Sequence, residues 1–425
     1  MTMFKKFLNS WYAKPLIIGL LIRILLMPIT LHPDLWGHSF TAYFFAYEWK
    51  LNIYEHLLSL PSDYPLVRNF GVGDIFIYPP LTYFTLGIFR FFSRPFTDAN
   101  FLPWVMENMS LVYQRKDLYW NLFVYKFPYL FVDLGMIYFF TKLFKEDKKK
   151  KIALLLMLFN PLSLYSTFMV GQIDILPVFF TVLSLYFYKN KKLELSLLSL
   201  GVGGSYKMYP LLFVLPLAFI GAKQLIPRLK LSFLGFLPFI LTIIPYLGSE
   251  AFRGMVLFSP KSQKMLFMGL NVSGAEVIYI FLAALSGVYA YLYYTRKNTS
   301  LANIFLCILL IIFSVTHYHP QWFLWITPFL IYQQVRDNFK YWELVVTFLI
   351  SWLIITLFFE ASLSYGLFNP LLPELNNAKS LSEILATYTD VFQLKSLIRS
   401  VFAGFSFYYI YRLFKESSNI SLIKK

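Results

Sequence analysis

The residues of this chain that could do chemistry stand in short polar segments between long apolar runs. The first segment, residues 32–38, reads HPDLWGH and places Asp34 directly after an apolar run. A carboxylate at such a place caps the following helix, by accepting hydrogen bonds from free backbone N–H groups, or acts as a general base on an acceptor hydroxyl. Position alone leaves these two interpretations equally open.

A second polar segment, GQID at residues 171–174, joins two apolar runs through a very short turn. Asp174 could simply cap the helix that follows, which is the simpler interpretation when the residues are taken by themselves. If the turn lies beside a cavity, Gln172 and Asp174 could instead bind sugar hydroxyls.

Lys207 follows the next apolar run and has no acidic neighbour in the sequence. An ionisable residue at membrane depth costs about 2.5–3.5 kcal/mol and is usually functional. The natural partner of Lys207 is therefore an anion, such as a lipid phosphate. The alternative is that its long side chain carries the ammonium group to the membrane interface.

A last polar turn reads HYHPQW at residues 317–322, and its proline suits the first turn of the next helix. His317 and His319 could bind a metal ion only with carboxylates from elsewhere in the chain, so a hydrogen bond to phosphate is the favoured role. Arg23 and Asp133 lie inside apolar runs, and we expect them to pair with other helices rather than to react.

The elements that must position these residues are apolar helices. Of the 425 residues, 58% are hydrophobic and 14% are charged, whereas soluble proteins are about 45–50% apolar and about 25% charged. Runs such as 14–31, 118–144, 231–247 and 341–359 are long enough to cross a hydrocarbon core about 30 Å thick. The sequence therefore predicts an all-α integral membrane protein, with residues 1–425 as a single domain.

The net charge of +16 indicates a topology rather than a nucleic-acid partner. The basic residues form short clusters between the apolar runs, which is the pattern of loops kept in the cytoplasm. Lys5, Lys6 and Lys14 precede the first run as in a signal peptide, but no small-residue cleavage site follows, so this run is read as an uncleaved helix. A single cysteine, Cys307, excludes an internal disulfide and a cysteine metal site.

The basic clusters place both ends of the chain inside and predict 12 or 13 spans. Residues 75–92 break the parity of crossings if they cross fully, so either they are re-entrant on the outer side, as we expect, or part of residues 93–117 crosses as well. Outward loops are expected at residues 32–75, 248–272 and 361–393. From residue 152 onward the spans pair as outward hairpins, near residues 152–169 and 174–189, 193–206 and 208–222, 231–247 and 273–294, 301–315 and 322–334, and 341–360 and 394–413.

This topology gathers the reactive side chains on the outer face. A transporter would concentrate such groups near mid-membrane, whereas an enzyme that works at one face collects them there. The distribution therefore favours an enzyme. The outward segments contain every histidine and three aspartates: His32, His38, His56, His317 and His319, with Asp34, Asp63 and Asp74.

Several short motifs, taken in order, resemble a known family. Asn160-Pro161-Leu162, then GQID at 171–174, then KMYP at 207–210 are similar to the middle of the multi-spanning GT-C glycosyltransferases. The resemblance is closest to family 87, the bacterial polyprenyl-phosphate-mannose-dependent mannosyltransferases, with GPI mannosyltransferase I nearby. YPPL at 78–81 and HPQW at 319–322 fit the same pattern, so the similarity covers about residues 15–335.

The resemblance implies a GT-C bundle whose outward loops form the active site. Such an enzyme moves a hexose, here mannose, with inversion from a polyprenyl- or dolichyl-phosphate sugar to a lipid- or glycan-linked acceptor. The family's essential first-loop aspartate corresponds to Asp34, and its late-loop histidine to His319. GPI mannosyltransferase I has Asp-x-Asp at the first position, whereas this chain has Trp36, which argues against that enzyme and against a required divalent metal.

The expected site thus has Asp34 as catalytic base and a group of residues that bind the donor. No cofactor is firmly implied, and a divalent metal is allowed but not required. The carrier's apolar tail would lie in a groove open to the bilayer, in the plasma membrane of a prokaryote or the endoplasmic reticulum of a eukaryote. Donor phosphate and sugar are assigned to Lys207, His319, His317, Gln172, Asp174 and Tyr78, with Arg253, Lys261 or Lys264 as further cations.

Two other classes of protein compete with this interpretation. A transporter or flippase of lipid-linked sugars would bind the same groups without reacting, and it predicts polar residues spread through the middle of the spans. A structural membrane subunit would have no use for the outward cluster of histidines and aspartates. Release of polyprenyl phosphate from a labelled donor separates an enzyme from both.

Overall fold

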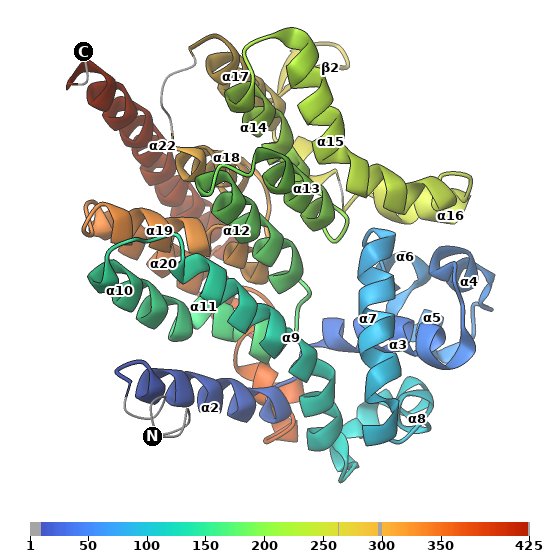
Figure 1. The fold of residues 1–425 in the computed structure, drawn as a ribbon. Coiled ribbons are helices and arrows are strands. Elements are labelled where there is room, and N and C mark those ends of the chain that lie inside the picture. The colour runs from blue at the N-terminus through green and yellow to red at the C-terminus, as the bar shows by residue number, and fades with distance from the viewer. Residues whose placement is uncertain (1–9, 262, 296–299, 424–425) are drawn as a thin grey trace, which may run out of the picture.

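The structure is a computed structural model in which most of the chain is helical (Figure 1). It describes residues 10–261, 263–295 and 300–423, without the side chains of Asp74 and of residues 416–423. The prediction of a helical chain is confirmed for this part. Basic residues that helped to define the inside lie outside the described residues at Lys5, Lys6, Arg296 and Lys297.

One segment corrects the all-α prediction. The strands β1 (Gly269–Ser273) and β2 (Glu276–Tyr279) form an antiparallel hairpin, where the sequence analysis expects a helix to begin at residue 273. Gly274 takes a φ of 50° in the turn between them, a backbone conformation that glycine adopts without strain. The helix α17 therefore starts only at Ile280 and runs to Thr295.

Helices long and apolar enough to cross a membrane are fewer than predicted. There are three: α9 (Leu118–Thr141), the segment Asp147–Met169, and the segment Leu225–Tyr246. The helices α2 (Ala13–Ile29) and α3 (Pro33–Glu48), which meet at 83°, would add a fourth if together they form one span. By length and composition the described chain thus has three or four candidate spans, and the total of 12 or 13 stays a prediction.

The remaining apolar helices have 10–17 residues, below the about 20 that a straight span needs. They are short because polar turns interrupt the apolar runs; α12, for example, begins directly after Asp174. These helices are α12 (Ile175–Lys189), α13 (Leu193–Gly204), the pair η4 (Tyr209–Phe213) and α14 (Val214–Gly221), α17, α18 (Leu301–Val315) and α20 (Trp342–Leu357).

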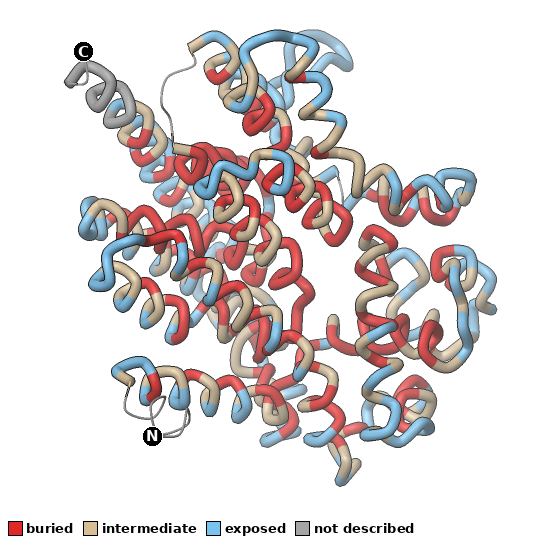
Figure 2. The backbone as a smooth tube through the Cα atoms, viewed as in Figure 1, coloured by how far each residue is buried: buried red, intermediate tan, exposed pale blue. Residues whose placement is uncertain are grey.

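The helix α18 lies at the centre of the bundle. Almost all of its side chains are buried (Figure 2), and α17, α19 (Thr327–Arg336) and α22 (Val391–Ile423) pack around it. Elsewhere small residues allow close contact between helices. A Cβ atom at Gly201 of α13 would lie 2.3 Å from the carbonyl oxygen of Gly235, so only glycine permits this approach.

The two long segments that look like continuous helices change their winding. Asp147–Met169 consists of α10 (Asp147–Leu158), α11 (Pro161–Ser163) and the wider π-type turn η3 (Leu164–Met169). Leu225–Tyr246 consists of α15 (Leu225–Ile243) and η5 (Ile244–Tyr246). Asn160 makes the first change, because its side chain caps α11 by accepting from the N–H groups of Leu162 and Ser163.

The segment between α3 and α9 folds into a unit of short helices at one end of the bundle (Figure 1). Its longest member, α7 (Pro80–Ser93), packs along α3 and is not among the apolar helices of span length. The re-entrant path of residues 75–92 stays a prediction. The other members are α4 (Ile53–Ser59), α5 (Pro65–Phe70), α6 (Val72–Ile75), η1 (Arg94–Phe96), α8 (Phe101–Glu107) and η2 (Met109–Gln114).

The other two predicted outward loops also contain short turns of helix. Residues 248–272 include α16 (Glu250–Phe252), η6 (Arg253–Leu257) and η7 (Lys264–Leu266). In residues 361–393 the elements are η9 (Ala361–Leu363), η10 (Tyr365–Phe368), η11 (Pro373–Asn377) and α21 (Leu381–Leu385). The turn η8 (Pro320–Trp325) precedes α19.

Arg23 and Asp133 form a buried ion pair that links α2 to α9. The Nε atom of Arg23 donates to Asp133 Oδ2 at 2.7 Å, and its Nη1 atom donates to the carbonyl oxygens of Gly19 and Leu158. Both side chains are fully buried. The prediction that these residues pair between helices is confirmed.

This pair predicts an asymmetric response to mutation. Arg23→Met leaves the Asp133 carboxylate buried without its partner, which should cost about 3–5 kcal/mol of stability. The double variant Arg23→Met with Asp133→Leu removes both charges and should recover most of the loss. Thermal unfolding of the purified protein in detergent measures both, and equal stability of the single and double variants would contradict the prediction.

Candidate functional site

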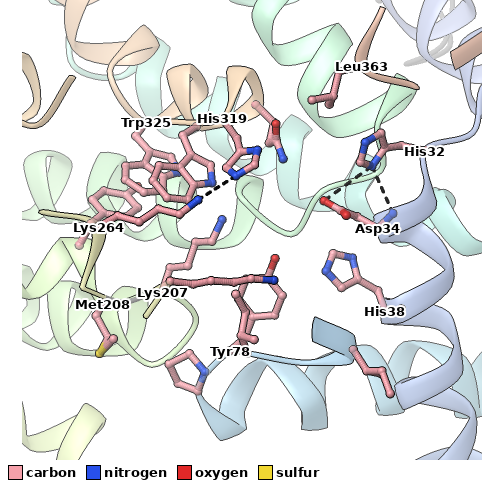
Figure 3. A pocket seen from close by; sticks show the side chains of 18 of the residues that line it. His32, Asp34, His38, Tyr78, Lys207, Met208, Lys264, His319, Trp325 and Leu363 are labelled. Atoms are coloured by element: carbon pink, nitrogen blue, oxygen red, sulfur yellow. Dashed lines mark hydrogen bonds and ion pairs between the residues drawn. The ribbon is translucent and has the colours of Figure 1, made fainter. Parts of the chain in front are cut away.

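A cavity of about 510 Å³ lies where the ends of several helices and the turns beside them meet (Figure 3). The start of α3, the turn before α7 and the turns η4, η7, η8 and η9 contribute to its wall. Acidic, basic and aromatic side chains are brought together there from segments far apart in the sequence. The polar lining consists of His32, Asp34, His38, Tyr78, Lys207, Tyr209, Lys261, Lys264, His319, Gln321, Trp322, Trp325 and Glu360.

Asp34 lines the cavity from the first turn of α3. The N-cap of this helix is His32, whose Nδ1 atom accepts the backbone N–H of Asp34 at 3.2 Å, and Pro33 fills the first helical position. The helix-capping interpretation of Asp34 is therefore wrong, because His32, two residues before it, is the N-cap. The side chain of Asp34 keeps 42% of its surface exposed, so its carboxylate is open to the cavity.

The protonation states around Asp34 follow from burial and charge. Burial lowers the pKa of His32, so its imidazole is neutral and can accept the Asp34 N–H. Burial raises the pKa of the Asp34 carboxyl, but the surrounding histidines, once protonated in the acid range where a carboxyl titrates, and Lys207 outweigh this effect, and the pKa lies below its ordinary value. Asp34 is thus an ionised carboxylate at neutral pH.

Gln172 lies behind Asp34 rather than in the cavity wall. It is buried, and its Nε2 atom donates a hydrogen bond to Asp34 Oδ2. Gly171 precedes it with a φ of 77°, which lets the chain turn sharply. The structure therefore makes Gln172 a support for the carboxylate, where the sequence analysis expects it to bind the donor sugar.

Lys126 of α9 is a buried residue that the sequence analysis misses. Its ammonium group donates to the carbonyl oxygen of Thr30 at 2.6 Å, to the Thr30 hydroxyl at 3.0 Å and to the carbonyl oxygen of Met169 at 2.9 Å. These carbonyls stand at the ends of α2 and η3, just before Asp34 and Gln172. The signal that could have identified Lys126 is its basic side chain inside a predicted span, with no acidic residue next to it in the sequence.

Lys207 has a partner that the sequence does not reveal. Its Nζ atom donates to Asp174 Oδ1 at 2.7 Å, and Asp174 is fully buried and also accepts from the indole N–H of Trp325. Asp174 makes no side-chain cap on α12 and does not line the cavity. Lys207 is therefore half of a buried ion pair, not the unpaired cation that the sequence suggests.

Aromatic rings surround the Lys207 ammonium group on its other sides. The Nζ atom lies 5.3 Å from the ring centre of Tyr78, 5.5 Å from that of Trp322 and 5.4 Å from that of Trp325. Trp322 and Trp325 stack with ring centres 5.0 Å apart, and Tyr209 continues the stack. Ring faces attract a cation, so this stack fixes Lys207 while it forms a flat aromatic wall of the cavity.

His319 and Lys264 meet at the other end of the cavity (Figure 3). The Nζ atom of Lys264 lies 3.1 Å from Nε2 of His319. Burial, then the charge of Lys264, lowers the pKa of His319 to about 3, so its ring is neutral and accepts this hydrogen bond. Burial also lowers the pKa of Lys264, because the ammonium group loses water and faces Lys261.

Not every predicted residue reaches the cavity. His317 is exposed and does not line it, although its ring centre is 5.7 Å from that of His319. Arg253 donates a hydrogen bond to the carbonyl oxygen of Leu247 and does not line the cavity. Glu360, by contrast, lines the cavity without having been predicted. It is the first charge after the apolar run 341–359, which is the signal that could have found it.

The site carries no ready-made metal centre in the described part of the chain. No group of three or more His, Cys, Asp or Glu side chains there is arranged to hold a metal ion. The pair His317 and His319 lacks the additional carboxylates that a metal site would need.

Comparison with known proteins places the chain in no family. No protein-family model matches it, and no curated protein and no solved structure matches it either. The resemblance to GT-C glycosyltransferases therefore remains an expectation that rests on the motifs of the sequence.

The pairing of Lys207 predicts different roles for two lysines in one cavity. Lys207→Met leaves the Asp174 carboxylate buried and unpaired, so the protein should lose about 3–5 kcal/mol of stability. Lys264→Met is the matched control, because Lys264 is half-buried at the rim and has no acidic partner among the described residues. Thermal unfolding in detergent should separate them, and a Lys207→Met protein as stable as the control would contradict the ion pair.

Proposed function

We propose that this protein is a membrane glycosyltransferase that moves a hexose, mannose by resemblance, from a polyprenyl- or dolichyl-phosphate sugar to a lipid- or glycan-linked acceptor. One observation carries the proposal. The Asp34 carboxylate and the Lys264 ammonium group face one cavity from its two ends, with Lys207 between them (Figure 3). Glycosyl transfer needs a base at one end of the reacting bond and a cation at the other.

The reaction uses these two ends in one displacement. Asp34 takes the proton from an acceptor hydroxyl, whose oxygen forms a bond to the anomeric carbon of the donor. The bond between that carbon and the phosphate oxygen breaks, and the lipid phosphate leaves with the electron pair. Lys264 and Lys207 offset the added negative charge, and His319 completes the polar contacts on that side. Attack opposite the leaving group inverts the anomeric configuration.

The size and lining of the cavity suit a hexosyl phosphate. Its volume of about 510 Å³ lies within the range of about 300–1,000 Å³ that is typical of small-molecule sites. Trp322 and Tyr78 offer flat aromatic surfaces to a sugar ring. A polyprenyl chain is too large for this space and must leave it along apolar side chains, of which Met208, Leu212 and Met265 line the wall.

A transporter or flippase of lipid-linked sugars is the competing proposal, and buried charges inside the bundle are the observation in its favour. Arg23 is paired with Asp133, however, and Lys126 is bonded to backbone carbonyls. None of the three lines the cavity. They stabilise the bundle and offer no polar path across it, so the enzyme remains the better-supported function.

Asp34→Asn tests the catalytic base. The variant keeps the shape of the side chain and the contact with Gln172, but it cannot accept a proton, so turnover should fall by at least ~10²-fold. The assay follows release of polyprenyl phosphate from a radiolabelled polyprenyl-phosphate mannose by purified protein. Asp63→Asn is the control, because Asp63 is exposed in the same outward segment and lies outside the cavity.

Two outcomes would count against the proposal. Turnover of Asp34→Asn within a factor of about three of wild type would remove Asp34 as the base. Movement of intact donor between leaflets of a vesicle, without release of polyprenyl phosphate, would favour the flippase.

The outward position of the site predicts a labelling pattern. In right-side-out membranes, Thr389→Cys should react with a membrane-impermeant maleimide, whereas Lys148→Cys should react only after permeabilisation. Both side chains are exposed, and the native Cys307 is buried and does not compete. The reverse pattern would place the cavity on the inner face and contradict the topology.

A further inference from the structure

The β-hairpin of residues 269–279 exposes an apolar surface. Every strand residue is exposed, and most are apolar. Phe267 and Met268, just before β1, are 65% and 49% exposed. The exposed apolar side chains of the strands are Leu270, Val272, Val277, Ile278 and Tyr279.

Such a hairpin is not expected to stand free in water. An isolated two-stranded hairpin is marginally stable at best, and contiguous exposed apolar patches mark sites of interaction. The only charged residue in the two strands is Glu276, beside the turn. The strand surface therefore needs an apolar partner.

The position of the hairpin identifies this partner as a membrane. The segment before the hairpin follows Leu225–Tyr246, which is long enough to cross a membrane. Only 17% of the most apolar stretch of this helix is buried inside the protein. The segment ends at Tyr279, and the apolar helix α17 starts at the next residue. The hairpin thus lies in the segment between two apolar helices, Leu225–Tyr246 and α17, whose side chains are largely left uncovered by the rest of the protein.

The depth of the hairpin is limited by its backbone. Its strands pair only with each other in the described structure, so their outer edges keep unpaired N–H and C=O groups. These groups cannot enter the hydrocarbon core without a large cost. The hairpin suits the headgroup region, where apolar side chains insert while backbone groups remain hydrated.

The chain just before the hairpin connects this surface to the cavity. Lys261, Lys264 and Met265 line the cavity and stand within a few residues of Phe267. The two lysines supply positive charge that complements a lipid phosphate. Met265, together with Met208 and Leu212, contributes to the apolar part of the lining.

We propose that the hairpin docks on the outer leaflet of the bilayer through Phe267, Met268 and its strand side chains, and that the lipid-linked donor passes from the bilayer into the cavity beside it. The docking depends on the surface described above, and its assignment to the outer leaflet rests on the predicted topology. The passage of the donor rests on the proposed glycosyltransferase function.

Docking is tested by placing a fluorophore on the hairpin. The protein with Val272→Cys, labelled with a nitrobenzoxadiazole dye, is reconstituted into vesicles of phosphatidylcholine and phosphatidylglycerol. The emission should shift to the blue and be quenched by lipids that carry a shallow spin label rather than by aqueous iodide. Ser62→Cys, exposed in the outer unit of short helices, is the control and should respond to iodide. An iodide-quenched Val272 dye would overturn the docking.

The donor route is tested by a change of charge on the same strand. Leu270→Asp should raise the KM for a long-chain polyprenyl-phosphate mannose in vesicles by about tenfold, since an apolar side chain no longer inserts. Turnover, and the KM for a water-soluble short-chain donor, should stay near wild type. Asn271→Asp adds the same charge at the neighbouring exposed position and should leave all of these constants unchanged.

The outcomes separate the two proposals. An equal effect of Leu270→Asp on long- and short-chain donors would overturn the route beside the hairpin. If the protein released no polyprenyl phosphate from any donor, the glycosyltransferase and the donor route would both fall. The fluorescence experiment would still decide the docking.

Discussion

The geometry of the site depends on the hydrogen bonds that the side-chain nitrogen of Lys126 donates. The helix α2 and the turn η3 both end beside it, at Thr30 and Met169, where backbone carbonyls have no partner within their own helix. The buried side-chain nitrogen of Lys126 donates hydrogen bonds to the carbonyl oxygens at both ends. The turns that follow Thr30 and Met169 are thereby held together. These turns lead to Asp34 and Gln172.

The contacts around the cavity continue from this junction. Gln172 reaches Asp34 because both stand a few residues beyond the carbonyls that Lys126 holds. Two residues after Gln172, Asp174 binds Lys207 and the Trp325 indole. Buried polar groups are costly when unpaired and reinforce one another when they are joined. The site thus combines separate hydrogen-bonded groups set into an apolar bundle, with the Asp34 carboxylate at one end of the cavity and the Lys264 ammonium group at the other.

The same constraint explains the unusual lengths of the helices. The helix α12 begins directly after Asp174, and α18 ends just before the turn with His319. These helices fall short of a membrane span, and the polar turns beside them carry Asp174, which binds Lys207, and His319, which lines the cavity.

The sequence by itself determined the apolar runs, and with them the approximate helices, as well as the turns that bring Asp34, Lys207 and His319 to one cavity. These are local properties, since hydrophobic runs and turn residues act over a few positions. Only the tertiary structure decided the pairing of side chains. Arg23 meets Asp133 across 110 residues, and Lys207 meets Asp174 across 33. Such contacts depend on how helices are rotated and packed against each other. The sequence therefore left Lys207 without a visible partner, and it assigned His317 to the donor although His317 does not line the cavity. The strand β2 likewise formed where a membrane helix was expected to begin, after a turn in which Gly274 takes a positive φ.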